Sequence, residues 1–227
     1  MPLPLLITRP KDDAERLAEE LRALVPELSV ILAPVLEIRP LPFDLPDEPF
    51  DLVLISSQHA IPAALSCDNL PVVCVGAATA RKAEVAGLTV RAVFPTADDL
   101  VRGLADQKDS RALHLHGYHT RGNVSKRLTA AGLETKECVV YDQIARSWTT
   151  AEQSEIFDQP QLLVPLYSPR SAQILSENLA GYTGELTLIA ISEVCREAWS
   201  GPLAKSICVA EHPDGEIMKQ VIASKLS

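Results

Sequence analysis

The feature that most constrains the fold of this chain is a pattern of strands and helices that occurs twice in the same order. An apolar strand at Leu5–Pro10 is followed by a helical pattern and by the strand Ser29–Leu32. The same order returns at Ala112–Gly117 and Thr135–Tyr141. Two later pairs of segments also match, namely Ile55–Ala60 with Leu166–Ser171 and Val73–Thr79 with Ile189–Cys195. Matching pieces in one order favour two related lobes of about 110 residues each over chance similarity between two βαβ arrays.

Strand and helix signals alternate along the whole chain. Lys11–Leu24 has apolar residues at helical spacing, and Asp12 and Asp13 suit the positive N-terminal end of a helix. Further helices are predicted at Ala77–Ala86, Asn123–Ala131 and Arg170–Asn178. Strands are predicted at Leu3–Thr8, Val30–Ala33, Leu52–Ile55, Val72–Val75, Ala112–Leu115, Cys138–Tyr141, Gln161–Leu166, Leu186–Ile191 and Ser206–Val209. This alternation predicts an α/β fold of parallel sheets flanked by helices, in two similar flavodoxin-like lobes.

Composition and charge exclude several classes of function. The formal net charge of −9 disfavours nucleic acid and anionic membranes as partners, although a local basic cluster could still bind a small anion. No run approaches the roughly 18 apolar residues of a membrane span, and Leu3–Ile7 is interpreted as a first strand and not as a signal peptide. The five cysteines are dispersed without a CxxC pair, which indicates reduced thiols and a cytoplasmic location.

Polar residues follow four of the predicted strands, each at the start of a helix. They are Thr8–Arg9, Ser56–Ser57, Gly76–Thr79 and Ser168–Arg170. Ligands of parallel α/β sheets bind at the carboxyl ends of strands, where helix N-termini offer free N–H groups to anions. Ordinary helix capping by Ser and Thr is the alternative at each single position. Four such ends in the cleft between two lobes would suit a substrate with many anionic groups.

Other familiar motifs are absent or incomplete. Gly76–Ala80 follows a strand, but the chain contains neither GxGxxG nor GxxxxGK[ST], and it has no GxSxG nucleophile motif. His114, His116 and His119 form an HxHxxH group, but no carboxylate or cysteine lies close in sequence, so we assign no metal ligand. We expect one of these histidines to be packed and the others to line a polar strand end. Cys195 has no evident base and is interpreted as a small buried residue rather than a nucleophile.

Tyr141 ends an apolar strand near the point where the chain is expected to pass between lobes. A phenol can donate a proton or a hydrogen bond at neutral pH because its ordinary pKa is about 10. A structural tyrosine at a domain boundary is the alternative interpretation. Both remain open on the residues alone.

At these residues the sequence resembles the uroporphyrinogen-III synthase family, over essentially the whole chain. The resemblance rests on short ordered segments, which are Leu6–Pro10, Ala33–Ile38, Leu54–Ala60, Val75–Ala80, Ala131–Leu133, Val140–Tyr141 and Tyr167–Arg170. It implies an enzyme, a lyase of haem biosynthesis, that closes the linear tetrapyrrole hydroxymethylbilane to uroporphyrinogen III. Water leaves, an azafulvene cation and a spiro-pyrrolenine follow, and ring D is inverted. The family uses no metal or cofactor, so none is expected, and a monomer is expected.

The resemblance also implies a crossed topology. A first, discontinuous lobe would contain residues 1–35 and 146–227, and a second lobe would contain residues 36–145. Strands near Val35–Pro40 and Val139–Ala145 would pair as a hinge beside the cleft.

Individual site residues follow from the same resemblance. Tyr141 corresponds to the family's conserved tyrosine and is the candidate catalytic acid. Arg9, Ser57, Gly76, Thr79, Arg121, Ser168, Ser192 and Cys195 are the candidate substrate-binding residues. His116 replaces an arginine that the family often has, and Ser192 and Cys195 replace its usual glycine and threonine. These replacements keep open a second hypothesis, that the chain is a non-enzymatic two-lobed protein that binds a small anion. A phospho-sensor ranks third, because no strand end carries a convincing phosphorylatable Asp.

Overall fold

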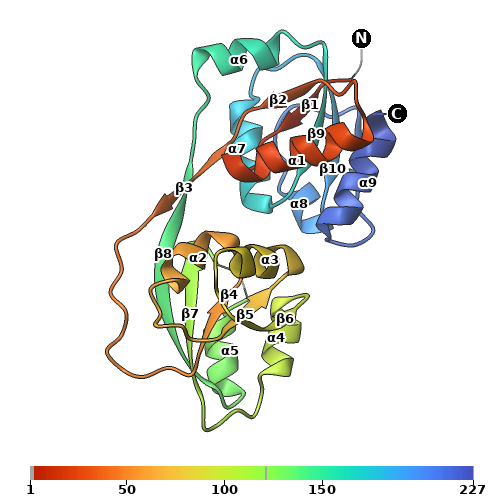
Figure 1. Ribbon diagram of the computed structural model, residues 1–227. Helices are drawn as coiled ribbons and strands as arrows, with labels where there is room; N and C mark the ends of the chain where they lie inside the picture. Colours follow the sequence, from red (N-terminus) through yellow and green to blue (C-terminus); the bar gives the residue numbers. More distant parts are fainter. Residues whose placement is uncertain (1–2, 121, 227) are drawn as a thin grey trace. The chain divides into compact units, whose positions relative to one another are not determined.

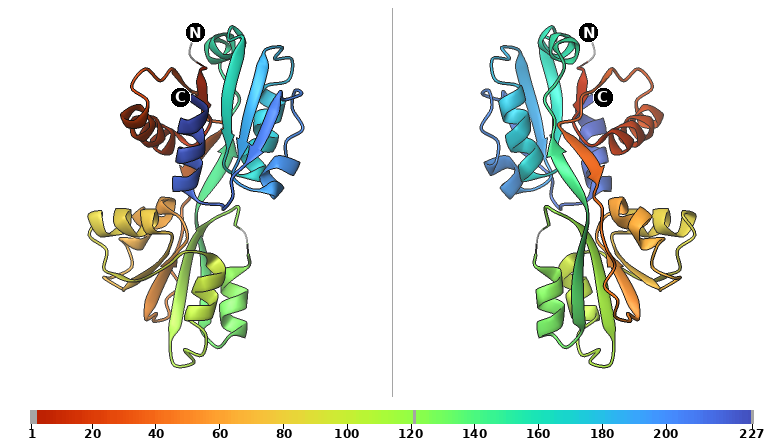
Figure 2. Two further views of the ribbon diagram at one scale, coloured as in Figure 1. Left: turned by 90° about the vertical axis from the view of Figure 1, so that its right-hand side faces the viewer. Right: turned by 90° about the vertical axis from the view of Figure 1, so that its left-hand side faces the viewer.

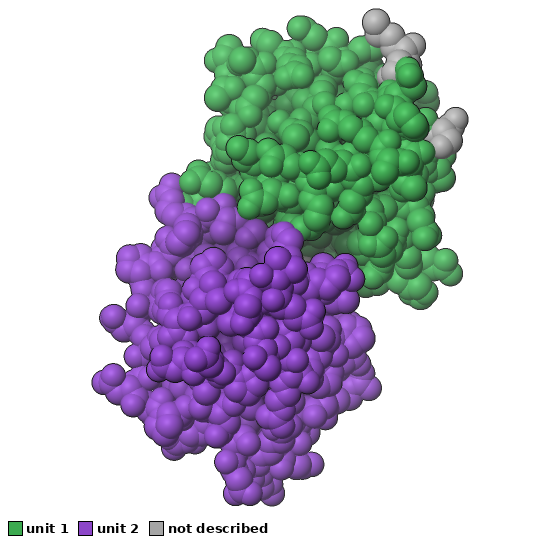
Figure 3. Space-filling view, in the orientation of Figure 1, with its two compact units in different colours: residues 1–37, 144–227 green, residues 38–143 purple. Residues whose placement is uncertain are grey.

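The computed structural model describes residues 3–120 and 122–226, and the chain divides into two compact units (Figure 3). Unit 1 contains Met1–Glu37 and Ile144–Ser227, and unit 2 contains Ile38–Gln143. Unit 1 is therefore discontinuous in sequence. The chain leaves it after its first strands and returns to it along one long strand.

Unit 1 is a parallel sheet with helices on both faces (Figures 1 and 2). Its strands lie in the order β11-β10-β9-β1-β2, and the pairings between them are parallel. The strands are β1 (Leu5–Ile7), β2 (Val30–Leu32), β9 (Gln161–Leu166), β10 (Glu185–Ala190) and β11 (Ser206–Val209). The helices are α1 (Lys11–Leu24), α6 (Thr150–Phe157), α7 (Pro169–Asn178), α8 (Glu193–Glu197) and α9 (Gly215–Leu226).

Unit 2 has the same architecture with one added strand at its edge. Its strands lie in the order β3-β8-β7-β4-β5-β6. They are β3 (Leu36–Pro40), β4 (Leu52–Ile55), β5 (Val72–Val75), β6 (Val90–Phe94), β7 (Arg111–Gly117) and β8 (Glu134–Ala145). The helices are the 3₁₀ turn η1 (Gln58–Ala60), α2 (Ile61–Ala64), α3 (Ala77–Val85), α4 (Ala97–Gly103) and α5 (Val124–Ala130).

The strand order confirms the internal repeat. Reading from β2, unit 1 has the order β2-β1-β9-β10-β11, and reading from β8, unit 2 has the order β8-β7-β4-β5-β6. Each pair of matching sequence segments therefore occupies the same place in its sheet. Unit 1 has the flavodoxin-like order 2-1-3-4-5 along the chain. Unit 2 has the same spatial arrangement, but its chain enters the five shared strands at β4, so their order along the chain is 5-4-1-2-3.

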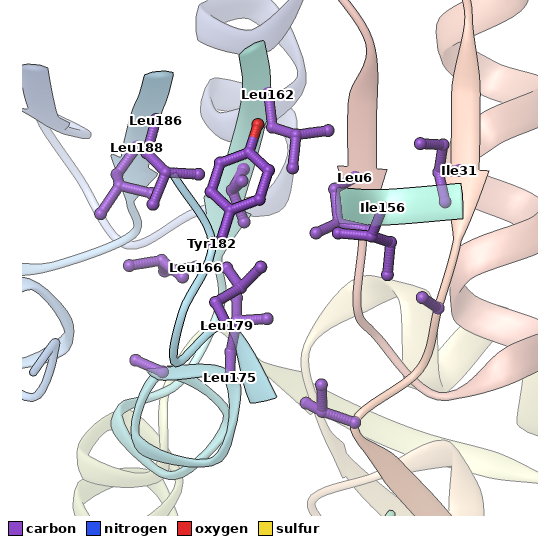
Figure 4. Packing of buried hydrophobic residues seen from close by; sticks show 14 of the residues in the cluster. Leu6, Ile31, Ile156, Leu162, Leu166, Leu175, Leu179, Tyr182, Leu186 and Leu188 are labelled. Carbon is purple, nitrogen blue, oxygen red and sulfur yellow. The ribbon is translucent and has the colours of Figure 1, made fainter. Parts of the chain in front are cut away.

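Strand residues alternate between the two faces of each sheet and so build two cores per unit. In unit 1, Leu6, Leu162 and Leu188 pack under Ile156 of α6 and Leu175 of α7 (Figure 4). The intervening strand residues face the other way and pack under α1 and α9. In unit 2, one face packs against η1, α2 and α3, and the other against α4 and α5.

The strands predicted as a hinge do pair. β3 lies beside β8 in the sheet order. Leu41 N–H donates to the Val140 carbonyl at 3.0 Å, and Arg146 N–H donates to the Val35 carbonyl at 2.9 Å. The partner numbers rise on one strand as they fall on the other, so this pair is antiparallel. The cleft expected beside it stays a prediction.

Two general findings concern membranes and thiols. Within the described residues, no helix is long and apolar enough to cross a membrane. All five cysteines are free thiols, and four of them are buried.

Candidate functional site

The sheet order places the polar strand ends at the expected position for ligand binding. In an order 2-1-3-4-5, the crevice opens where neighbouring strands send their connections to opposite faces, at their carboxyl ends. In unit 2 these strands are β7 and β4, which end near Gly117 and Ser57. In unit 1 they are β1 and β9, which end near Arg9 and Ser168.

Tyr141 reaches the strand end of unit 2 through an irregularity in β8. The register between β7 and β8 shifts at His116/Gly117, so that Gly117 lies opposite Tyr141. Val140 and Tyr141 are consecutive, yet both side chains belong to the same apolar cluster, whereas regular strand residues alternate. The bulge therefore turns the Tyr141 ring toward the face that carries η1 and α2.

The Tyr141 ring lies across a glycine. A Cβ atom on Gly117 would lie 2.6 Å from Cζ of Tyr141, so only glycine leaves room for the ring. The His59 ring meets the Tyr141 ring edge-on, with centroids 5.6 Å apart. The tyrosine is 5 % exposed.

The surroundings of Tyr141 keep its phenol protonated. Burial raises the pKa of Tyr141, while hydrogen bonds with the Ser57 side chain and the Gly117 backbone partly oppose the shift. The phenol is therefore neutral at physiological pH and can donate its proton to a hydrogen-bond acceptor. Ser57, Gly117 and Tyr141 come from separate strands and meet at one strand end.

Three of the predicted serines cap helices. Ser57 Oγ accepts from His59 N–H at 3.4 Å, Ser168 Oγ from Ser171 N–H at 3.0 Å, and Ser192 Oγ from Cys195 N–H at 3.3 Å. Capping was the ordinary alternative for these positions, and the structure shows it. Their hydroxyl groups can still donate to an anion while they accept from the helix.

The segment Gly76–Thr79 differs from these serine ends. Gly76 has φ +84°, a conformation that glycine adopts readily, and no side chain caps the helix α3 that follows it. Ala77 and Ala78 are exposed, and Thr79 is half-buried. This strand end therefore presents helix N–H groups together with a threonine in the first turn.

Sequence reasoning missed part of the strand end in unit 1. The guanidinium of the predicted Arg9 lies 4.4 Å above the Tyr167 ring and is 3.5 Å from Asp13. The buried Tyr167 hydroxyl and Arg170 Nη1 have no partner in good hydrogen-bonding geometry among the described residues. Tyr167 precedes the predicted Ser168, and its place in the Tyr167–Arg170 segment was the available signal for it. Arg170 belonged to the predicted polar strand end Ser168–Arg170 but was not named as a substrate-binding residue.

The prediction that Cys195 contacts a substrate is wrong for its side chain. Cys195 is 0 % exposed, belongs to the core of unit 1, and its thiol donates to the Leu166 carbonyl at 3.4 Å. A small thiol fills the space between α8 and β9 there. Its cap, Ser192, remains half-buried at the start of α8.

Two predictions remain, for Arg121 and for the three histidines of the HxHxxH group. Arg121 lies outside the described residues. In the HxHxxH group, His114 and His116 are both buried, at 2 % and 5 % exposure. His119 lies apart from them, with Nε2 3.5 Å from Asp142.

Comparisons with known proteins agree on one family. The model of the family HEM4, uroporphyrinogen-III synthase HemD, matches residues 15–220. No curated protein sequence matches the chain.

Solved structures of this family resemble the chain in fold. The uroporphyrinogen-III synthetase of Helicobacter pylori 26695 has a TM-score of 0.64 and 17 % identity, over 88 % of this chain and 93 % of that one. A variant uroporphyrinogen III synthase of the extreme thermophile Thermus thermophilus has a TM-score of 0.48 and 17 % identity, over 93 % and 96 %. The fold assignment rests on the first of these two. With the family model matching most of its length, the chain belongs to the uroporphyrinogen-III synthase (HemD) family.

Proposed function

We propose that this chain is a uroporphyrinogen-III synthase, a lyase that converts hydroxymethylbilane to uroporphyrinogen III with loss of water and inversion of ring D. The observation that carries this proposal is the family match over residues 15–220. The repeated flavodoxin-like sheet order supports it, because it brings polar strand ends together in each unit.

The proposed substrate contacts are the strand ends of the two units. Hydroxymethylbilane carries many carboxylates, and a carboxylate accepts hydrogen bonds from helix N–H groups, hydroxyls and guanidinium groups. In unit 2 the donors would be Ser57 and the uncapped Gly76–Thr79 segment. In unit 1 they would be Arg9, Ser168 and Ser192, together with Arg170. Holding a flexible chain in one folded geometry is the main contribution that such contacts make to ring closure.

Tyr141 is the proposed general acid. Loss of water from the substrate leaves a cation, and a donor that protonates the departing hydroxyl lowers the barrier to this step. Tyr141 can fill this role because its phenol is protonated at physiological pH, and its hydrogen bonds with Ser57 and the Gly117 backbone favour release of the proton by lowering the pKa against the effect of burial. Ser57 shares a hydrogen bond with the phenol and would position it.

The test is the isomer of the product. Purified chain is supplied with hydroxymethylbilane without added metal, the products are oxidised to porphyrins, and the type I and type III isomers are separated by chromatography. A synthase yields the type III isomer, whereas spontaneous closure without the enzyme yields type I. A product that is type I alone, at the rate of a heat-denatured sample, would refute the proposal.

The alternative of a non-enzymatic anion-binding protein is not favoured by the comparisons. It predicts tight binding of an anion with no ring closure, and the isomer assay therefore separates the two. A cytoplasmic location, a monomeric state and the absence of a cofactor stay predictions.

A further inference from the structure

Two buried histidines and a glutamate lie together in unit 2, on the face of the sheet that α4 and α5 cover. His114 and His116 are alternate residues of β7, so their side chains share a face with Ala112, which packs in that core. Glu137 of β8 is the register partner of His114. Potential ligand atoms of His114, His116 and Glu137 all lie within 4.8 Å of one another.

The tautomer of His116 is set by its backbone contact. His116 Nδ1 lies 2.8 Å from the Gly117 carbonyl oxygen, and since a carbonyl only accepts, Nδ1 carries the proton. Nε2 is then an unprotonated lone pair. It is buried and has no hydrogen-bond partner among the described residues. A buried acceptor without a hydrogen-bond partner destabilises the folded state, so a ligand bound at this atom would remove that penalty.

His114 is held in a similar way. Its Nδ1 lies 2.8 Å from Ser125 Oγ of α5. The two imidazole rings are 4.7 Å apart between centroids. The Ser125 hydroxyl therefore fixes the orientation of the His114 ring, as an outer partner does for a metal-binding histidine.

Solvent reaches the Glu137 side of this cluster, while His114 and His116 are buried. A pocket of about 520 Å³ is lined by residues of α5 and β8, and these include Ser125 and Glu137. Glu137 is exposed, so its carboxylate can move toward the two imidazole rings.

We propose that His114, His116 and Glu137 bind one Zn²⁺ ion between β7 and β8, with solvent in the fourth position. Two imidazoles and one carboxylate are a common ligand set for zinc with an open position. Backbone carbonyls and hydroxyls on the other ring nitrogen are the usual outer partners of such histidines, and Gly117 and Ser125 occupy those places. Ligand atoms of a tetrahedral zinc lie about 3.3 Å apart, so the three groups, now within 4.8 Å of one another, draw closer when zinc binds.

This proposal departs from the sequence expectation that the chain has no metal ligand. The sequence pattern contained the histidines but lacked a nearby carboxylate, and the pairing of β8 with β7 supplies it. The proposal is independent of the synthase activity, since the cluster lies on the opposite face of the sheet from the Tyr141 ring.

The experiment measures zinc binding to the full chain after treatment with a chelator. Isothermal titration should give one zinc per chain, and Co²⁺ in its place should give the intense visible absorption of a tetrahedral site. Glu137→Gln should weaken zinc binding at least tenfold, and His116→Gln should abolish it. The control is Glu134→Gln, which removes an exposed carboxylate from the same strand outside the cluster and should bind as the wild type does.

Thermal unfolding gives a second readout. A ligand that binds only the folded state raises the melting temperature, so zinc should stabilise the wild type and Glu134→Gln equally and Glu137→Gln less. Glu137 is exposed, so its replacement leaves the core intact, and circular dichroism verifies this. Absence of zinc binding by the wild type, or equal affinities of Glu137→Gln and Glu134→Gln, would overturn the proposal.

Discussion

At the scale of single residues, the strand end of unit 2 depends on a glycine and a tyrosine in contact. Gly117 makes room for the Tyr141 ring, and the shift of register beside it brings the ring onto the face where Ser57 lies. Neither residue would occupy this position in a regular strand. The candidate acid is therefore placed by a backbone irregularity as much as by its own side chain.

Replacing Gly117 by Ala should disturb this contact. The added Cβ would lie 2.6 Å from Tyr141 Cζ, and the ring would have to move. Overpacking of this kind costs about 1–3 kcal/mol of unfolding free energy, and the displaced phenol should also slow turnover. The control is Gly215→Ala, where a Cβ meets nothing within 4 Å. Urea denaturation and the isomer assay measure the two effects, and equal behaviour of both variants would contradict this account of Gly117.

Replacing Tyr141 by Phe should separate chemistry from packing. The ring remains, but the proton donor is lost, so kcat should fall by roughly 10²-fold while the unfolding free energy falls by only about 1 kcal/mol. Tyr182→Phe is the matched control, since it removes a hydroxyl that donates to the Gln159 carbonyl at 2.8 Å in unit 1. Its kcat should not change. Wild-type kcat in Tyr141→Phe would remove the phenol from the mechanism.

The sequence indicates which residues follow a strand, but it does not indicate the direction in which their side chains point. Ser57, Ser168 and Gly76 follow strands directly, and strand ends are visible as the end of an apolar run. The direction of a side chain is not visible. Cys195 points inward because it lies on the inner side of the short helix α8, and Tyr141 is turned by a register shift between strands that are distant in sequence.

At the scale of elements, β8 connects the two units, and its end is fastened inside unit 1. Arg146 Nη1 donates to the Pro34 carbonyl at 3.0 Å, and Nη2 lies 2.7 and 2.9 Å from the Glu152 carboxylate oxygens. Thr149 and Glu152 form a capping box at the start of α6. Glu152 therefore caps a helix and fixes the returning strand at the same time.

Glu152 should make the stability of unit 1 sensitive to acid. Burial opposes its ionisation, but hydrogen bonds from the Thr149 backbone and Arg146 outweigh burial and lower its pKa below the ordinary 4.5. A lowered folded pKa contributes stability above about pH 4.5 that is lost as the pH falls through the folded pKa.

The variant Glu152→Gln removes the negative charge but keeps the helix cap, because glutamine can also take this position in a capping box. The difference in unfolding free energy between wild type and variant should be about 1 kcal/mol at pH 7 and should shrink as the pH falls below 4.5. Urea denaturation at several pH values measures it. Glu155→Gln, an exposed change on the same helix, should have little effect at pH 7. A difference that grows toward low pH would have the wrong sign.

Element boundaries were predictable where apolar runs are continuous. Leu52–Ile55, Val72–Val75 and Gln161–Leu166 are strands in the structure with the predicted ends, and Lys11–Leu24 is a helix with the predicted ends. β8 was predicted as Cys138–Tyr141 but extends over Glu134–Ala145, because its first half alternates with exposed charged residues. β6 was missed for a similar reason, since Arg91 interrupts a half-exposed edge strand.

At the scale of the whole molecule, the chain has separate cores for its two units. The apolar clusters of unit 2 contain only residues between Ile38 and Tyr141, and those of unit 1 contain only residues outside that range. Each unit therefore buries its own sheet on both faces. The internal repeat was the sequence signal that predicted this division.

Because its cores are self-contained, the continuous fragment 38–143 should fold alone. It should unfold cooperatively in urea as measured by circular dichroism. Leu128→Ala, at a fully buried position, should destabilise it by about 2–5 kcal/mol, whereas Val85→Ala, at a position 90 % exposed, should not. A fragment without cooperative unfolding would show that unit 2 needs unit 1 to fold.

The central claim is that this chain, a member of the HemD family by its sequence, directs ring closure of hydroxymethylbilane. The ratio of type III to type I porphyrin after reaction with the intact chain tests it most directly, with heat-denatured chain as the reference. The account predicts mostly type III isomer with the intact chain and type I with the reference. The same type I product from both samples would contradict it.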